Sequence, residues 1–189
     1  MDHIIRAVRA EDWPKVKELR LVALADPVAH LAFLENTEQA LAKPDSLWQE
    51  RAANAAEGRT SRQFVAEAPD GRWLGSVTVL VELPGDATVF GGVQGRAQTH
   101  LVGVFVRPEA RGTGLAGELF RAAVEWSWAL AQPRAERVRL YVHEHNTRAR
   151  AMYAKAGFQP TGDTVPFPGD PSQRELELAL PRTPSVAGR

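Results

Sequence analysis

The chain has 189 residues, of which 23 are Lys or Arg and 23 are Asp or Glu, and it contains no cysteine. Its length fits one domain with a sizeable core, and its balanced charge does not favour nucleic acid or an anionic membrane as a partner. Without cysteine the chain can form no disulfide, no thiolate nucleophile and no cysteine-ligated zinc site.

No stretch of the sequence is apolar for long enough to span a membrane, and residues 1–6 lack the basic and apolar segments of a signal peptide. We therefore expect a cytoplasmic protein. No internal repeat or linker divides the chain. Residues 1–181 are predicted to form a single domain, and residues 182–189 a flexible tail.

The first third of the chain predicts one strand followed by helices. In order, these are a strand over residues 4–8, a helix capped by Asp12 and ending near residue 26, a weaker helical segment over 30–41, and a helix that follows Pro44 and stops at Gly58.

Strands dominate the middle of the chain. The pattern predicts a strand over residues 62–68, a turn at 69–72, a strand over 73–81, a glycine-rich loop over 83–97 and a strand over 98–106. A loop of that length in a compact domain is often functional.

The strand over residues 98–106 leads into a glycine-containing turn, and a helix begins at Leu115. Gly112 and Gly114 let the backbone of this turn approach a ligand closely and leave N–H groups unpaired. Together with the helix N-terminus and Arg111, they predict a site for a phosphate or pyrophosphate. Two glycines alone could equally form a tight turn without a ligand, so a second motif is needed to decide.

The same turn also spells G-x-G-x-x-G through Gly112, Gly114 and Gly117, which is the pattern of dinucleotide-binding enzymes. Two features argue against that interpretation. Residues 107–111 separate the first glycine from the strand, and the motif does not follow the first strand of the chain. A dinucleotide-binding oxidoreductase is therefore kept as a minor alternative.

The rest of the chain returns to alternating elements. The predicted order is a helix from residue 115 to 130, a buried strand over 138–142, a helix over 148–156 capped by Asn146 and ended by Gly157, and strands over 158–165 and 174–180. The succession of strand, helix and strand predicts a parallel pair joined by a crossover.

Two motifs together resemble the GCN5-related N-acetyltransferase (GNAT) superfamily. They are Val106-x-Pro108-x-x-Arg111-Gly112-x-Gly114-Leu115-Ala116 and, one helix and one strand later, Asn146-x-x-Ala149-x-x-Met152-Tyr153-x-Lys155-x-Gly157-Phe158. The order of the surrounding elements agrees, so the resemblance covers most of the chain. It implies an α/β fold with a mixed, largely antiparallel sheet flanked by helices and a splayed parallel strand pair.

The resemblance also implies direct transfer of an acetyl group from acetyl-CoA to a primary amine, without a metal. It assigns the pantetheine contact to the backbone of Val104, Phe105 and Val106, the pyrophosphate to Arg111, Gly112, Thr113, Gly114, Leu115 and Ala116, and the general acid for the leaving thiolate to Tyr153. Asn146 should either hydrogen-bond the pantetheine or cap the last helix.

The base and the acceptor site are less defined. His100 occupies the strand position at which some members of the superfamily carry Glu or His as the general base, so it could accept the amine proton. A packed strand histidine is an equally good interpretation. The run His143-Glu144-His145 suggests no third metal ligand, and we expect it to be a solvated strand end. The acceptor is expected to lie near Glu35, Glu38, Trp48 and the loop over 83–97. The alternative is that the two acids are solvated and that the Trp belongs to the core.

The expected partners are acetyl-CoA and an amine acceptor, with a possible homodimer, and without nucleic acid or membrane. A non-catalytic sensor that binds acyl-CoA is the alternative from another functional class. Such a sensor would keep residues 111–116 but would need neither a base nor an acid.

Overall fold

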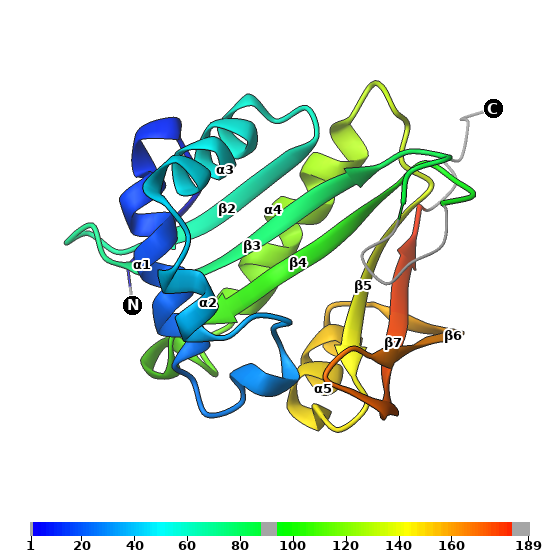
Figure 1. Cartoon of the computed structure of the whole chain (residues 1–189). Helices are drawn as coiled ribbons and strands as arrows, with labels where there is room; N and C mark the ends of the chain where they lie inside the picture. The colour runs from blue at the N-terminus through cyan, green and yellow to red at the C-terminus, as the bar shows by residue number, and fades with distance from the viewer. Residues whose placement is uncertain (1, 88–93, 183–189) are drawn as a thin grey trace.

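The computed structural model describes residues 2–87 and 94–182, and its centre is a seven-stranded sheet in the order β1-β2-β3-β4-β5-β7-β6 (Figure 1). Its strands are β1 Ile4–Ala7, β2 Ser61–Glu67, β3 Trp73–Glu82, β4 Gln98–Val106, β5 Arg137–His143, β6 Gln159–Phe167 and β7 Asp170–Pro181. Strands β4 and β5 are parallel, and the other neighbouring pairs are antiparallel. The predicted mixed sheet is confirmed. A dinucleotide-binding fold would need a mostly parallel sheet, so that alternative does not fit.

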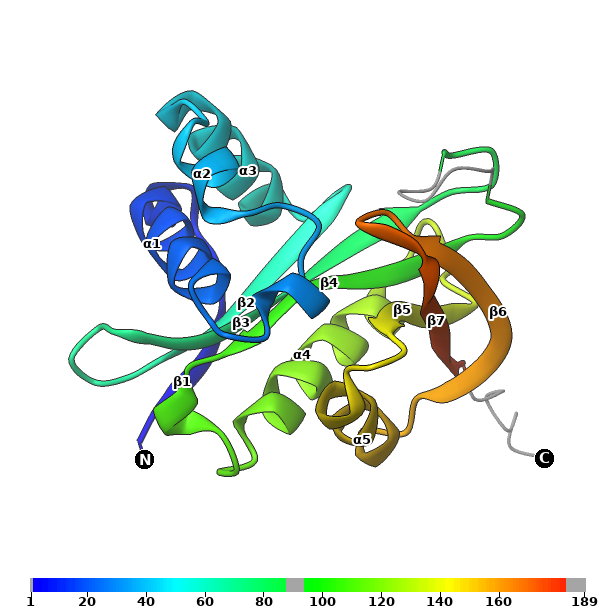
Figure 2. The same ribbon diagram turned by 60° about the horizontal axis from the view of Figure 1, so that its bottom comes forward.

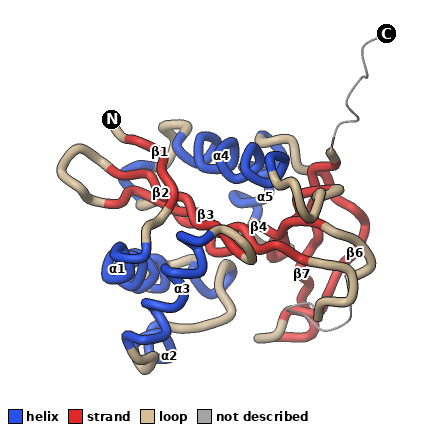
Figure 3. The backbone as a smooth tube through the Cα atoms, turned by 90° about the horizontal axis from the view of Figure 1, so that it is seen from above, coloured by secondary structure: helices blue, strands red, loops and turns tan. Residues whose placement is uncertain are grey.

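The helices form two layers, one on each face of the sheet. Figures 2 and 3 show α1, α2 and α3 on one face, and α4 and α5 on the other. Their bounds are α1 Trp13–Leu24, α2 Thr37–Leu41, α3 Asp45–Glu57, α4 Leu115–Ala129 and α5 Thr147–Lys155, with short 3-10 helices η1 Ala10–Asp12, η2 Ala29–Leu31 and η3 Pro108–Ala110.

Each face of the sheet buries its own hydrophobic core. Strand β4 shows how, because successive side chains of a strand point to opposite faces. Phe105 belongs to the core under α1 and α3, whereas Val104 and Val106 pack against the core under α4 and α5. The predicted α/β architecture therefore follows from strands that are apolar on both sides.

Two details of the N-terminal third differ from the sequence prediction. The segment over 30–41 is not one helix, because Asn36 begins a new one: its side chain accepts a hydrogen bond from the backbone N–H of Gln39 at 2.9 Å. Asp12 precedes α1 but does not cap it. Its carboxylate instead accepts hydrogen bonds from the N–H of Arg9 at 2.9 Å and from the guanidinium of Arg6 at 2.6 Å.

The predicted boundaries elsewhere are close to the observed ones. The C-terminal strand β7 runs to Pro181, and residues 183–189 of the predicted tail lie outside the described residues. Residues 88–93 of the predicted glycine-rich loop lie outside them as well. Over the described ranges, none of the helices is both long and apolar enough to cross a membrane.

Gly75 on β3 offers a test of the packing between the sheet and α4. A Cβ at this position would lie 2.7 Å from the carbonyl oxygen of Phe105, 3.2 Å from Val106 Cγ2 and 3.3 Å from Leu119 Cδ1. Because a backbone atom cannot move aside easily, Gly75→Ala should lower the free energy of unfolding by about 1–3 kcal/mol. The matched control is Gly95→Ala, whose Cβ would meet no atom within 4 Å. Chemical denaturation of both variants checks this, and equal stabilities would contradict the packing described.

Candidate active site

Strands β4 and β5 separate soon after they begin. They pair only at Thr99 with Val138 and at His100 with Arg139. Beyond these residues, within the described chain, β5 pairs only with β7, and residues 101–106 of β4 pair only with β3 (Figure 1). The edge of β4 that faces β5 is therefore unpaired. Such an edge can bind an extended ligand in the way that it would bind an additional strand.

A β-bulge lies in β4 where the two strands have separated. The register shifts between Ser76 and Thr78 of β3, so that Gly103 and Val104 together oppose a single residue. Gly103 has φ of +60°, a left-handed conformation that glycine adopts without strain. A bulge bends its strand and changes the direction of its backbone groups, so this segment can present an N–H group toward the gap between the strands.

The turn after β4 exposes a row of backbone N–H groups. Gly112 and Gly114 have φ of +81° and +94°, and Gly114 precedes the first residue of α4. Among the described hydrogen bonds, none uses the N–H groups of residues 112–116. A Cβ at Gly112, Gly114 or Gly117 would meet no atom within 4 Å. The turn therefore offers open space beside several free donors at a helix N-terminus, which suits a pyrophosphate.

The guanidinium of Arg111 is already engaged within the protein. Its Nε donates to the carbonyl oxygen of Val106 at 2.9 Å, and an Nη donates to the carboxylate of Asp26. Burial alone would raise the pKa of Asp26, but the hydrogen bonds from Arg111 and the N–H of Val28, together with the nearby positive charges, lower it. The side chain of Arg111 thus ties the turn to the end of α1, and the N–H groups of residues 112–116 are the free donors of the turn.

The phenol of Tyr153 lies on α5 inside the core. Its ring centroid is 5.5 Å from that of Phe120 and 6.2 Å from that of Phe158, and the residue is 7% exposed. Its hydroxyl makes none of the described hydrogen bonds. Burial, and then the negative charge of Glu175, raise the pKa of Tyr153 above its usual value. Like any tyrosine, it carries its proton at neutral pH, as a proton donor must.

Asn146 caps α5, as one of the two sequence interpretations expected. Its Oδ1 accepts a hydrogen bond from the N–H of Ala149 at 3.1 Å. The Nδ2 group makes no described hydrogen bond, so the predicted contact with pantetheine stays a prediction. Gly157 follows the helix with φ of +95°, as predicted for its C-terminal end.

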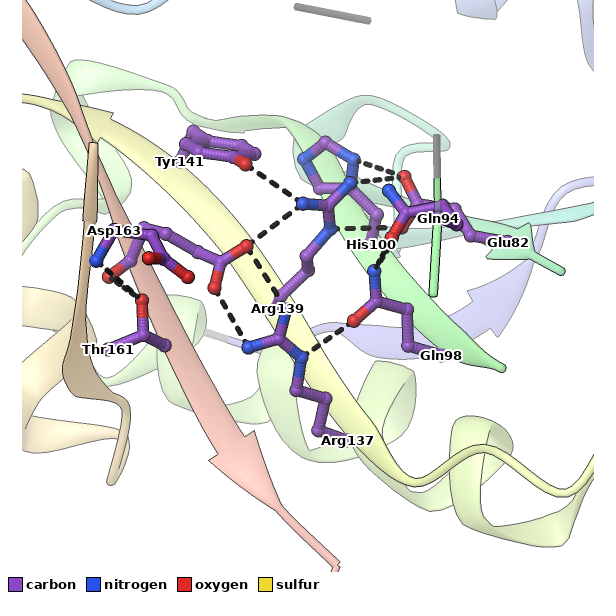
Figure 4. Close-up of polar contacts among 10 residues, drawn as sticks. Glu82, Gln94, Gln98, His100, Arg137, Arg139, Tyr141, Thr161 and Asp163 are labelled. Carbon is purple, nitrogen blue, oxygen red and sulfur yellow. Dashed lines mark hydrogen bonds and ion pairs between the residues drawn. The ribbon is translucent and has the colours of Figure 1, made fainter. Parts of the chain in front are cut away.

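His100 is part of a buried polar network at the base of the separation between β4 and β5 (Figure 4). Its Nδ1 lies 3.0 Å from Glu82 Oε1, and Arg139 donates to both oxygens of Glu82 at 2.8 and 2.9 Å. Burial alone would raise the pKa of Glu82, but the hydrogen bonds from His100 and Arg139 lower it to about 2.

The network continues across β5 to β7. Arg139 donates to Glu177 Oε2 at 2.9 Å, and Arg137 donates to Glu177 Oε1 at 2.8 Å. His100 is 2% exposed and Arg139 is 3% exposed. The role of His100 as a base stays a prediction, while its burial and its pairing with Glu82 favour a role in positioning the strands.

Two of the residues expected around the acceptor, Glu35 and Trp48, both lie near Lys43, whose Nζ is 5.9 Å from the Trp48 ring centroid, and their role at the acceptor stays a prediction. Glu35 accepts hydrogen bonds from Arg20 at 2.7 Å and from Lys43, so the expectation of a solvated acid is wrong for this residue. Glu38 is exposed on α2. Trp48 is 1% exposed in the core under α1 and α3, which confirms the packing interpretation.

The described ends of the loop over 83–97 approach each other. The N–H of Gly85 donates to the carbonyl of Gln94, and the N–H of Gln94 donates to the carbonyl of Asp86, both at 2.9 Å. The side chain of Gln94 then accepts a hydrogen bond from Gln98 in the buried network. Through Gln94, the end of the loop that precedes β4 is therefore joined to the polar network.

Glu175 and His143 are buried polar residues that the sequence interpretation did not single out as a site. His143 is 0% exposed, so the predicted solvated strand end is wrong for this residue, whereas His145 is exposed. The ring of Phe167 packs against His143 at a centroid distance of 4.7 Å. Burial raises the pKa of Glu175 to about 7. Acidic and apolar residues alternate over 175–178, which places both acids on one face of the strand. This alternation did not show that the face is covered.

No group of His, Asp or Glu in the described part of the chain could hold a metal ion.

Known sequences and solved structures were found to resemble this chain. A family model described as the Acetyltransferase (GNAT) family matches residues 20–158. No curated protein matches the chain.

Solved structures share the fold over nearly the whole chain. An acetyltransferase of the GNAT family from Streptococcus pneumoniae has a TM-score of 0.69 at 18% identity, covering 96% of this chain and 100% of that chain. PaiA N-acetyltransferase from Thermoplasma acidophilum, in complex with coenzyme A, has a TM-score of 0.66 at 17% identity, covering 94% of this chain and 98% of that chain. NAA60 from Arabidopsis thaliana, in complex with acetyl-CoA, has a TM-score of 0.65 at 16% identity, covering 95% of this chain and 98% of that chain. At these identities the likeness shows the fold.

The raised pKa of Glu175 predicts a pH-dependent stability. The unfolded carboxyl ionises near 4.5 and the folded one near 7, so between these values the unfolded state has lost a proton that the folded state retains. The free energy of unfolding contributed by this group therefore falls as pH rises from about 4.5 to 7, by up to roughly 3 kcal/mol. Glu175→Gln should gain stability relative to the wild type by about that amount between pH 4.5 and 8.

Urea denaturation across this pH range measures the difference. Glu136→Gln is the control, because Glu136 has a side chain that is 58% exposed and lies 4.0 Å from Arg96. Its stability curve should run parallel to that of the wild type. A parallel curve for Glu175→Gln as well would mean that Glu175 ionises normally in the folded protein.

Proposed function

Because the chain belongs to the acetyltransferase (GNAT) family, we propose that it transfers the acetyl group of acetyl-CoA to a primary amine. One observation carries the proposal: the unpaired edge of β4 leads directly to the free N–H groups of residues 112–116. An extended chain bound along the edge would place a diphosphate at the turn. Acetyl-CoA has this form, with a pantetheine arm that ends in a pyrophosphate.

The proposed binding mode assigns a part of acetyl-CoA to each segment. The backbone of residues 104–106 hydrogen-bonds the pantetheine arm, since these residues have no strand partner on the side of β5. The N–H groups of residues 112–116 bind the pyrophosphate. Asn146, at the N-terminus of α5, is placed beside the arm and keeps its Nδ2 available for it.

The proposed reaction is direct attack of the amine on the thioester carbonyl. The oxyanion that develops needs a fixed donor, and an N–H of the bulged segment at Gly103 and Val104 can supply it. The leaving thiolate takes a proton from the hydroxyl of Tyr153, which is protonated at neutral pH. No protein nucleophile is needed, in accord with a chain that lacks cysteine.

His100 is proposed to position the strands and not to accept the proton itself. Its Nδ1 is paired with Glu82, and Arg139 is paired with the same carboxylate. The ring lies at the last paired residue of β4 and β5. Replacing His100 would therefore disturb the place where the strands separate.

A non-catalytic acyl-CoA sensor remains the second candidate, since the binding segments would serve it equally. The two candidates differ in what they require of Tyr153: an enzyme uses its hydroxyl as a proton donor, whereas a sensor needs only the packing of its ring on Phe120 and Phe158. Release of free coenzyme A from acetyl-CoA in the presence of aminoglycosides, polyamines, amino acids and peptides separates the two. A sensor would release none in an amine-dependent manner.

Gly117 allows the pyrophosphate site to be tested without straining the turn. It occupies the third position of α4, its Cβ would meet no atom within 4 Å, and its φ is not left-handed. An acid in the first turn of a helix is tolerated or stabilising, so Gly117→Asp should fold while repelling a pyrophosphate. We expect the Kd for coenzyme A to rise by about tenfold or more, which corresponds to about 1.4 kcal/mol.

Gly117→Ala is the matched control, because it adds the Cβ without the charge. Its Kd, measured by calorimetry, should stay within about threefold of the wild-type value, which is under 1 kcal/mol. If the Asp and Ala variants bind coenzyme A equally well, the pyrophosphate does not bind at this turn.

Tyr153→Phe tests the proton donor. The substitution keeps the ring and its packing on Phe120 and Phe158, and the lost hydroxyl makes no described hydrogen bond. Folding and coenzyme A affinity should therefore be unchanged, whereas kcat should fall by about 10²–10⁴-fold when thiolate departure limits the rate. Steady-state release of coenzyme A measures this. A wild-type kcat, in a reaction shown to be limited by chemistry, would leave Tyr153 as a packing residue.

A further inference from the structure

Glu175 is a buried carboxylate without a cationic partner. Over residues 2–87 and 94–182, three glutamates are buried: Glu82, Glu175 and Glu177. Glu82 and Glu177 both pair with Arg139. Glu175 is 6% exposed, and within the described chain it has no ion pair and no hydrogen bond. A buried carboxylate is normally paired, so the place of a cation beside Glu175 is open.

The carboxylate keeps contact with solvent although the residue is buried. Four unpaired side-chain nitrogens are completely enclosed in the described part of the chain, on Trp48, Arg62, Gln94 and His143. The oxygens of Glu175 do not belong to this set although they have no described hydrogen-bond partner, so they are not completely enclosed.

The strand register places Glu175 on the same face as His143. The two residues are paired between β7 and β5. Leu176, next to Glu175 on β7, packs against the core under α4 and α5, so Glu175 points to the opposite face. His143 ends β5, beyond the point where β4 has separated from it. The carboxylate thus lies at the open end of the strand pair, where the proposed acyl site is.

The neighbouring titratable groups do not supply the missing positive charge. Burial, and then the nearby imidazoles of His145 and His30, lower the pKa of His143, so its ring is neutral. His143 Nδ1 accepts a hydrogen bond from the N–H of His145 at 3.2 Å. Tyr153 on α5 is close enough for the charge of Glu175 to raise its pKa.

We propose that Glu175 binds the ammonium group of the acceptor and accepts its proton. The acceptor is then a primary alkylammonium whose nitrogen lies between Glu175 and the thioester. This inference rests on the proposed acetyl transfer. It also explains why a carboxylate on this sheet is left without an arginine while both other buried glutamates have one.

The reaction then balances with the groups that are present. The ammonium gives one proton to Glu175, and the free amine attacks the carbonyl carbon to form the C–N bond. The C–S bond breaks, and the thiolate takes a proton from Tyr153. The nitrogen, which now carries one proton too many, returns a proton to Tyr153. Glu175 releases its proton to solvent, so the products are the amide, coenzyme A and one proton.

The direct test is the ionisation of Glu175 itself, followed by carbon-13 NMR of the side-chain carboxyl. The probe is n-butylamine, which is cationic below pH 9, added to the protein with coenzyme A bound. Binding of a cation next to the carboxylate should lower the measured pKa of Glu175 by about one unit or more. n-Butanol has the same chain without the charge and should leave it unchanged. An unchanged pKa with saturating n-butylamine would overturn the proposal.

Kinetics of Glu175→Gln give a second readout. With an amine that the wild type acetylates, kcat/KM should fall by about 10²-fold or more and the acidic limb of its pH profile should disappear. The Kd for coenzyme A should not change. Glu136→Gln, with its largely exposed carboxylate, should behave as the wild type.

The two experiments separate this inference from the proposed function. If amines are acetylated but Glu175→Gln keeps the wild-type kcat/KM and pH profile, the function stands and the inference is wrong. If no amine is acetylated but n-butylamine still lowers the pKa of Glu175, acetyl transfer is wrong and the ammonium site stands.

Discussion

The early separation of β4 from β5 is the constraint on which the rest of this structure depends. The two strands share only two paired positions, too few to hold a parallel pair by backbone hydrogen bonds alone. The buried network supplies the rest, since Arg139 on β5 joins Glu82 on β3 to Glu177 on β7. Removing one partner of such a buried pair typically costs about 3–5 kcal/mol. The network therefore fixes the position at which the strands separate, and with it the position of the unpaired edge.

The candidate site is assembled from elements that this separation leaves facing one another. The edge of β4 and the turn before α4 lie on one side, and the end of β5 with Tyr153 and Glu175 lies on the other. The pair of Asp26 and Arg111 connects the turn to the segment after α1. A substitution of Asp26 would therefore act on the site by moving the backbone of the turn, although Asp26 itself contacts no proposed ligand.

The sequence was informative where local chemistry decides the structure. The turn at Gly112 and Gly114, the cap at Asn146 and the strand β4 all follow from short-range patterns, and they are found where they were predicted. The environment of His100 and the burial of His143 depend on residues distant in the chain, such as Arg139 and Phe167. Alternation along β7 placed Glu175 and Glu177 on one face, but only the packed fold shows that Glu177 meets arginines and Glu175 does not.

Amide hydrogen exchange with and without coenzyme A tests the central claim that the unpaired edge and the free N–H groups hold the cosubstrate. The N–H groups of residues 112–116 make no described hydrogen bond in the free protein, and the edge of residues 104–106 that faces β5 has no strand partner in the described chain. Coenzyme A should slow exchange in residues 104–106 and 112–116, and should leave the strands β1 and β2, on the far side of the sheet, unchanged. Binding of coenzyme A without protection of these two segments would contradict the account.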